Sequence, residues 1–150
     1  MFNSVLQYLK KSAVTYTDKI ALVDGEKEIS YDVLYKRARE IGTFMATRVG
    51  TDKKPIVVLM DKCAEAVISF WGILSAGNVY VPLDAHAPVS RINTILSFVD
   101  PAMVIVDNIY RDKTVELAVE NEKIICYEEL PACEIDGKLL DKIERNIVDT

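Results

Sequence analysis

Four short apolar runs, separated by stretches with helical periodicity, constrain the fold of this chain more than any other feature. The runs are PIVVLM at 55–60, VYVPL at 79–83, MVIV at 103–106 and IICY at 124–127. Each is continuous and rich in β-forming residues, which is typical of strands covered on both faces. The order over residues 55–127 is therefore β-α-β-α-β-α-β. Such alternation predicts an α/β fold with a mainly parallel, doubly wound sheet.

Apolar stripes predict the three helices of this core, in 64–76, after Pro88, and around 115–119. Their inner residues are Ala64, Val67, Ile68, Trp71 and Leu74; Ile92, Ile95, Leu96 and Val99; and Val115, Ala118 and Val119. We expect Asp61 to cap the first helix and Gly77-Asn78 to end it. Pro82 is expected at the end of its strand, where a missing N–H costs least.

Residues 1–54 follow a different pattern. A short helix is expected from a cap at Asn3 or Ser4 to about Lys11, with Val5, Leu6 and Leu9 on one side. Asp24-Gly25 between two β-prone runs, 20–23 and 28–31, predicts a hairpin. A long helix is expected over 32–48, with Gly50 after its end.

The last segment, 128–150, belongs to an acidic third of the chain. Residues 1–106 carry 12 Lys and Arg against 11 Asp and Glu, whereas 107–150 carry 6 against 12. An amphipathic helix is predicted here from Leu139, Leu140, Ile143 and Ile147, with its partner left open between this domain and another element. We expect one unit over 1–150, divided into 1–54, 55–127 and 128–150.

Composition excludes several classes of protein. A net charge of −5 argues against nucleic-acid binding, which favours a basic face. The longest apolar run, 66–74, is far shorter than the ~20 residues of a membrane-spanning helix. Three cysteines (Cys63, Cys126, Cys133) without a C-x-x-C pair indicate neither a disulfide framework nor a zinc site. With no secretory signal in view, we expect a reduced, cytoplasmic protein.

Candidate residues for chemistry are few. The segment 72–77 has the G-x-x-x-x-G spacing of a phosphate loop but lacks the following Lys-Ser/Thr, so a helix glycine and a helix end are favoured. His86, the single histidine, is a conceivable partner for a Cys63 nucleophile, but no orienting third group is visible. A turn residue after Asp84 is the favoured interpretation.

Other polar and aromatic residues have structural interpretations. Glu128 and Glu129 are interpreted as solvated surface, and Trp71 and Tyr80 as core aromatics. We assign no catalytic, cofactor-binding or metal-binding residue from the sequence.

Three motifs carry a resemblance to a known family. They are ISYDVL at 29–34, LSAGNVYVPLD at 74–84, and Pro88, Arg91, Ile92, Ile95 and Leu96 of a P-x-x-R-I-x-x-I-L pattern; DKIAL at 18–22 adds to them. Over about its first 107 residues the chain resembles the N-terminal part of the adenylate-forming (AMP-binding) enzymes. The similarity is to amino-acid adenylation domains of the peptide-synthetase and D-alanine–carrier protein ligase type. Departures from the pattern are Val33, Ser75 and 85–87, where the family has Glu, Lys and P-x-Y.

The resemblance implies an activity for the full-length enzyme: ATP-dependent formation of aminoacyl-AMP, with Mg²⁺, and transfer of the acyl group to a phosphopantetheine carrier-protein thiol. The family's phosphate loop and catalytic lysine have no matching positions here. We therefore expect an inactive N-terminal fragment whose partners are the remainder of the enzyme and its carrier protein.

Two alternatives stay open at this point. The first is a non-catalytic interaction or complementation module on the same fold, with self-association through an exposed apolar surface. The second is an unrelated flavodoxin-like binding domain. The activated acid and the acceptor thiol, carrier protein or coenzyme A, are not determined by these residues.

Overall fold

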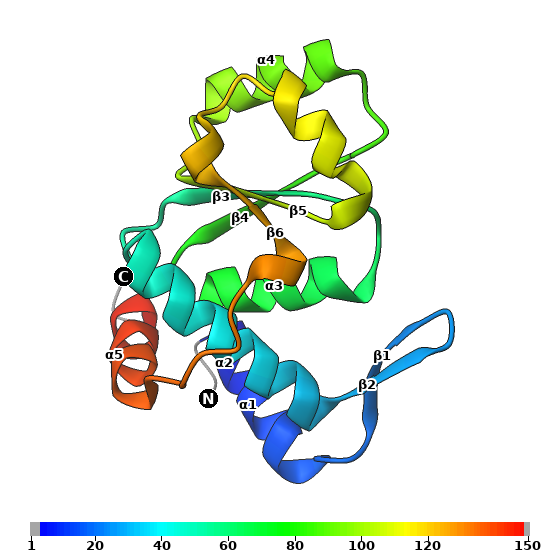
Figure 1. The fold of residues 1–150 in the computed structure, drawn as a ribbon. Helices are drawn as coiled ribbons and strands as arrows, with labels where there is room; N and C mark the ends of the chain where they lie inside the picture. Colours follow the sequence, from blue (N-terminus) through cyan, green and yellow to red (C-terminus); the bar gives the residue numbers. More distant parts are fainter. Residues whose placement is uncertain (1–3, 149–150) are drawn as a thin grey trace.

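The computed structural model describes residues 4–148, which form a parallel sheet, a separate hairpin and five α-helices (Figure 1). In chain order the elements are α1 (Val5–Thr15), β1 (Ile20–Asp24), β2 (Lys27–Ser30), α2 (Tyr31–Arg48), β3 (Pro55–Leu59), α3 (Ala64–Ser75), β4 (Val79–Leu83), α4 (Val89–Val99), β5 (Met103–Val106), the 3₁₀ helices η1 (Asn108–Glu116) and η2 (Asn121–Lys123), β6 (Ile124–Cys126), the 3₁₀ helix η3 (Tyr127–Glu129) and α5 (Gly137–Val148). No helix among these residues is long and apolar enough to cross a bilayer.

The four predicted core strands pair in the order β4-β3-β5-β6, and every pair is parallel. Helices α2 and α3 lie on one side of this sheet and α4 on the other (Figure 1). Alternate residues of β3 supply the two faces. Ile56 and Val58 belong to the cluster under α2 and α3, and Val57 and Leu59 to the cluster under α4. The predicted parallel, doubly wound α/β sheet is confirmed.

Strand β4 corrects the prediction that each apolar run is covered on both faces. It lies at the sheet edge, and Val79 and Tyr80 are 48% and 37% exposed. Tyr80 is thus not a core aromatic; its ring stacks on Phe70 with centroids 4.5 Å apart. The Val79 N–H donates to the Lys54 carbonyl at 3.0 Å, toward β3. By alternation Pro82, which has no N–H, faces the open edge, where proline is tolerated.

The crossover from β5 to β6 corrects a second prediction. In place of an α-helix around 115–119, the chain forms η1 and an irregular segment. The Asp107 carboxylate accepts a hydrogen bond from the Tyr110 N–H at 3.1 Å and starts this tighter turn. Val115 is 83% exposed while Leu117 is buried, so the supposed stripe does not share one buried face.

Helix α1 is longer than predicted and presents a different side. It ends at Thr15 rather than near Lys11, and its buried residues are Leu9 and Ala13, while Val5 is exposed. Ser4 occupies the cap position without a side-chain hydrogen bond, and Asn3 lies outside the described residues.

The hairpin and the long helix after it match the prediction. Gly25 turns the hairpin with a positive φ of 58°. The Ser30 hydroxyl accepts a hydrogen bond from the Val33 N–H at 3.4 Å and caps α2. This bond uses the backbone N–H of residue 33, so it forms without the glutamate side chain that the family has at that position.

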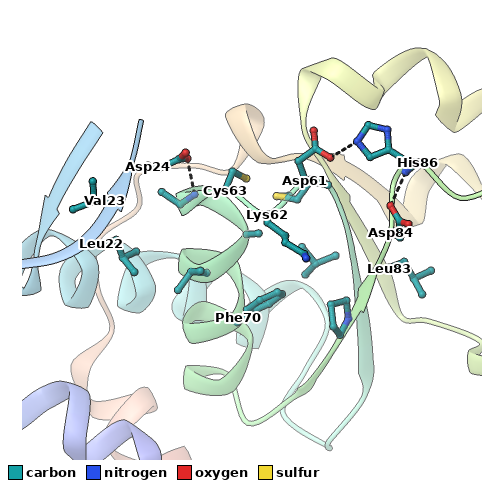
Figure 2. A pocket seen from close by; sticks show the side chains of 16 residues that line it. Leu22, Val23, Asp24, Asp61, Lys62, Cys63, Phe70, Leu83, Asp84 and His86 are labelled. Carbon is teal, nitrogen blue, oxygen red and sulfur yellow. Dashed lines mark hydrogen bonds and ion pairs between the residues drawn. The ribbon is translucent and has the colours of Figure 1, made fainter. Parts of the chain in front are cut away.

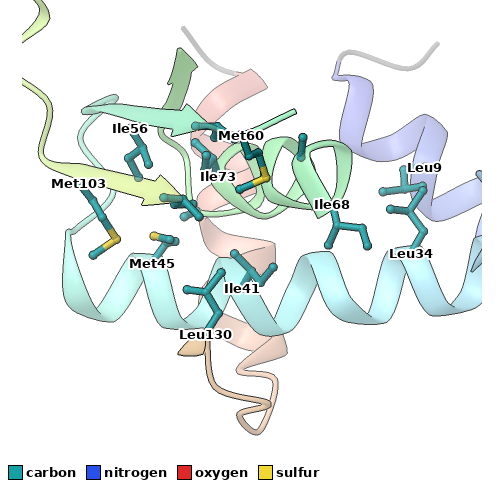
Figure 3. Close-up of a cluster of buried hydrophobic side chains, with 14 residues drawn as sticks. Leu9, Leu34, Ile41, Met45, Ile56, Met60, Ile68, Ile73, Met103 and Leu130 are labelled. Carbon is teal, nitrogen blue, oxygen red and sulfur yellow. The ribbon is translucent and has the colours of Figure 1, made fainter. Parts of the chain in front are cut away.

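The core beneath the sheet is formed mainly by α2, α3 and strands β3 and β5. Figure 3 shows Ile41 and Met45 of α2 directed toward Ile56, Met60, Ile73 and Met103. Helices α2 and α3 approach closely at two glycines. A methyl group on Gly42 would lie 2.7 Å from Cβ of Ser75, and one on Gly72 would lie 2.4 Å from Cγ2 of Ile41.

Helix α5 finds its partner within this unit, which settles the alternative left open by the sequence. Leu140 and Ile143 are buried, and α5 contacts α2 and α3. Arg37 of α2 holds the preceding segment by donating to the carbonyls of Leu130 at 2.9 Å and Pro131 at 3.1 Å. The acidic C-terminal segment is therefore a packed part of the fold.

Candidate functional site

The candidate site is a pocket of about 920 Å³ at the carboxyl ends of β3 and β4 (Figure 2). Its apolar lining comes from the hairpin, α3 and β4, and includes Leu22, Val23, Val67, Phe70 and Leu83. Its polar lining consists of Asp24, Asp61, Lys62, Cys63, Asp84 and His86. Ligands of open α/β sheets bind outside the carboxyl ends of the strands, so this is where the fold favours a site.

Three side chains from three successive strand ends meet beside this pocket. Asp61 follows β3, His86 follows β4, and Tyr110 lies in η1 after β5. His86 Nε2 lies 2.8 Å from Asp61 Oδ1, and the Tyr110 hydroxyl donates to the same oxygen at 3.0 Å. The Tyr110 hydroxyl is also 3.1 Å from His86 Nε2, with the two rings edge to face. We call these residues the Asp61–His86–Tyr110 cluster.

The turn that carries His86 is fixed by its own contacts. The His86 N–H donates to Asp84 Oδ1 at 2.9 Å, as predicted for a turn residue after Asp84. Lys113 of η1 donates to the carbonyls of Ala85 at 2.6 Å and Ala87 at 3.0 Å. The backbone around His86 is thus held independently of its ring.

The structure does not form the Cys63–His86 pair considered from the sequence. Both residues line the pocket, but the His86 ring is bonded to Asp61 and Tyr110. Burial raises the pKa of the Cys63 thiol, which disfavours the thiolate that a nucleophile requires. The orienting third group that the sequence did not reveal is Asp61, and it orients His86 without a nucleophile bonded to the ring.

Tyr110 is the cluster residue whose pKa is shifted most clearly from its ordinary value. Burial and the hydrogen bond to Asp61 raise the pKa of Tyr110 to about 12, and the charges of Asp107 and Asp84 act in the same direction. Its hydroxyl therefore stays protonated and remains a donor to Asp61 over the neutral range.

The N-terminus of α3 carries a carboxylate, but not the predicted one. Asp24 of the hairpin accepts a hydrogen bond from the Ala64 N–H at 2.9 Å, while Asp61 belongs to the cluster. Beside it, Lys27 Nζ lies 2.6 Å from Glu65 Oε1. Burial of the Glu65 carboxylate acts to raise its pKa, but the bond and charge of Lys27 outweigh this and lower it. The same bond raises the pKa of Lys27.

The remaining candidates have structural roles. Gly72 lies inside α3 and Gly77 follows its end with a φ of +75°, so the phosphate-loop spacing is a helix glycine and a helix end, as predicted. Glu128 and Glu129 are exposed; Glu128 accepts a hydrogen bond from the Asn108 N–H, and Glu129 pairs with Arg111. Trp71 is partly buried against the core beneath the sheet. Within residues 4–148 there is no group of three His, Cys, Asp or Glu residues arranged for a metal ion.

A sequence signal for the cluster does exist. Asp61 stands one residue after a predicted strand, His86 three residues after the next, and Tyr110 four residues after the one that follows. Carboxyl ends of parallel strands meet at one sheet edge. Position after a predicted parallel strand thus indicates which residues lie at this sheet edge, but only the strand order brings the three side chains into contact.

Comparison with known proteins matches the chain to one family and to relatives of one kind. The profile of the family described as AMP-binding enzyme matches residues 9–145. Among curated relatives, the chain is 32% identical over 94 residues to cyclosporin synthetase simA of Tolypocladium inflatum, covering 63% of this chain and 1% of that one. It is 38% identical over 79 residues to a plipastatin synthase of Bacillus subtilis (strain 168), covering 53% and 3%.

Solved structures show the same fold. A four-domain nonribosomal peptide synthetase, holo-AB3403 bound to AMP and glycine, superposes with a TM-score of 0.77 at 20% identity, over 95% of this chain and 10% of that one. The chain spans only about 1–4% of the length of the curated relatives that it matches.

Proposed function

The chain belongs to the AMP-binding enzyme family, and from this premise we propose that it is the N-terminal scaffold of an amino-acid-activating adenylation domain. The full-length enzyme would join an amino acid to the α-phosphate of ATP, releasing pyrophosphate, and pass the aminoacyl group to a carrier-protein thiol. Residues 1–150 would contribute the first parallel sheet and its helices rather than the reacting groups. A cytoplasmic location, proposed from the free cysteines, fits this role.

The observation that carries the proposal is where the family motifs lie in the fold. The first motif spans the end of β2 and the start of α2, where Ser30 caps the helix. The second runs from the end of α3 through the left-handed Gly77 into β4. Pro88 of the third is the residue before α4. All three motifs lie where helices and strands begin, end or connect, which supports a scaffold role.

The described residues do not themselves fit the ATP and Mg²⁺ of this reaction. Helix N-termini that follow strands are the usual phosphate-binding positions of such folds, but the N-terminus of α3 holds the Asp24 carboxylate. The adjacent pocket also contains the carboxylates of Asp61 and Asp84. Like charges disfavour a polyphosphate here, so these residues do not favour binding of the ATP phosphates.

Amino-acid-dependent ATP–pyrophosphate exchange by the purified 150-residue chain tests whether the reacting groups lie outside these residues. We expect no exchange above the protein-free background with any of the common amino acids. Robust exchange would overturn the proposal, because it would require a complete active site within these residues.

A second candidate function, a protein-interaction module on this fold, is favoured by exposed apolar side chains. Val23, Phe98, Ile109 and Val115 are 69%, 92%, 78% and 83% exposed. A partner or a second copy that covered these side chains would bury apolar surface, which favours association. Under this alternative the chain self-associates or binds a partner stably, so a concentration-independent monomer in sedimentation would count against it.

A further inference from the structure

The residues of the Asp61–His86–Tyr110 cluster lie outside the three family motifs. The turn around His86 is already fixed by Asp84 and Lys113 through the backbone. The His86 side chain is nevertheless bonded at Nε2, although it is 73% exposed. The ring is thus held in one orientation at the rim of the pocket, with its Nε2 edge toward Asp61 (Figure 2).

Counting protons in the cluster determines which ring nitrogen carries a proton. The Tyr110 hydroxyl has one proton, and it donates that proton to Asp61 Oδ1. His86 Nε2 lies 2.8 Å from the same carboxylate oxygen. Two lone pairs at that distance would repel, so a proton must lie between them, and Nε2 must supply it. The Tyr110 oxygen can then accept from the same Nε2–H at 3.1 Å.

The geometry points to a modification site that we propose here: neutral His86 is held as the Nε2–H tautomer, and its Nδ1 is a nucleophilic nitrogen that accepts an acyl group from acid anhydrides. Fixing the proton on one ring nitrogen leaves the lone pair on the other. Asp61 then stands beside the nitrogen that does not react. Its carboxylate stabilises the positive charge that spreads over the ring during attack, as an orienting carboxylate does for other histidines.

The reaction balances without any further reactant. The Nδ1 lone pair forms a bond to the carbonyl carbon of the anhydride, and the bond from that carbon to the bridging oxygen breaks. The leaving carboxylate takes the electron pair of the broken bond. The ring is then an acylated imidazolium with its proton on Nε2. This proton passes to the bonded Asp61 carboxylate, which gives the neutral acylimidazole and an Asp61 carboxyl group that donates back to Nε2.

Since His86 is the single histidine, its state can be measured without ambiguity. Long-range proton–nitrogen NMR of the full chain, at a pH where the ring is neutral, should show the proton on Nε2 and a bare Nδ1. A ring that carries its proton mainly on Nδ1 would overturn the inference. This measurement uses the unmodified chain and so does not depend on the folding of any variant.

The rate of acylation is tested with diethyl pyrocarbonate, followed by the histidine-specific absorbance. Asp61→Asn keeps an acceptor for the ring but removes the charge, and should slow modification about tenfold, as loss of a charge-assisted bond implies. Asp112→Asn is the matched control, since it removes an equal charge from an exposed position of η1 that does not line the pocket. It should leave the rate within about twofold of the parent chain. Equal rates in Asp61→Asn and the parent chain, or equal slowing by both variants, would refute the proposal.

Discussion

Gly72 of α3 lies against Ile41 of α2 with no room for a side chain between them. A methyl group on Gly72 would lie 2.4 Å from Cγ2 and 2.6 Å from Cβ of Ile41, and Ile41 is completely buried. These two helices form the layer beneath the sheet, so their separation sets how the N-terminal part of the chain packs on the core.

Gly72→Ala is expected to lower the free energy of unfolding by about 1–3 kcal/mol, the usual cost of overpacking a core. The contacting atoms are a backbone-proximal branch of Ile41 rather than the end of a flexible side chain, so local adjustment is limited. Chemical denaturation measures the change. Gly137→Ala is the control, because its methyl would meet only the Arg39 guanidinium at 3.1 Å. Equal stability of the two variants would contradict the close approach.

Asp24→Ala is expected to destabilise the chain by about 1 kcal/mol, the typical effect of losing a helix N-cap. Asp24 acts as a cap from 40 residues away, by accepting the Ala64 N–H. Glu26→Ala removes an equal charge from the exposed tip of the same hairpin and should be nearly neutral. Amide exchange at Ala64 gives a local readout: it should accelerate in Asp24→Ala and stay unchanged in Glu26→Ala.

The Lys27–Glu65 pair should make stability depend on pH in the acidic range. The folded-state pKa of Glu65 is lowered by Lys27, so its contribution is present above the ordinary glutamate value and is lost as the pH falls through the folded-state value. The parent chain should therefore exceed Lys27→Met in stability at neutral pH, and the difference should vanish in acid. Denaturant titrations at several pH values test this. A difference that grows toward low pH would contradict the pairing.

Tyr110 should titrate later than an ordinary tyrosine. Its pKa is raised from 10.0 to about 12, so the contribution to stability is complete below pH 10 and is lost as the pH rises toward 12. Tyrosinate absorbance of the chain, which has 7 tyrosines, should include a late step whose amplitude Tyr110→Phe reduces. Tyr127, whose pKa burial also raises, is a second late group, and Tyr127→Phe distinguishes the two. An unchanged late step in Tyr110→Phe would show that Asp61 does not hold this hydroxyl.

The sequence predicts the α/β class and most element positions because apolar periodicity and turn residues act locally. It does not distinguish a central strand from an edge strand, since both are short apolar runs; at β4 the local clue was Pro82. The 3₁₀ crossover after β5 arises because the Asp107 side chain competes for backbone N–H groups, which helical periodicity does not describe.

The candidate site depends on relationships that no local pattern contains. Asp24 reaches α3 only because the hairpin folds back across its first turn, and Asp61 is thereby left to bind His86 and Tyr110. Both contacts follow from strand order and helix packing. The sequence predicts the turn after Asp84 that carries His86, but the partners of the His86 ring are set by the fold.

The scaffold role is tested most directly by exchanging this segment into a working enzyme. Residues 9–145 would replace the matching segment of a nonribosomal peptide synthetase adenylation domain, and amino-acid-dependent ATP–pyrophosphate exchange would be measured. The scaffold account predicts exchange with the host's own amino acid, because the reacting groups and the substrate pocket come from the host. A folded, soluble chimera that binds the amino acid but shows no exchange would contradict it.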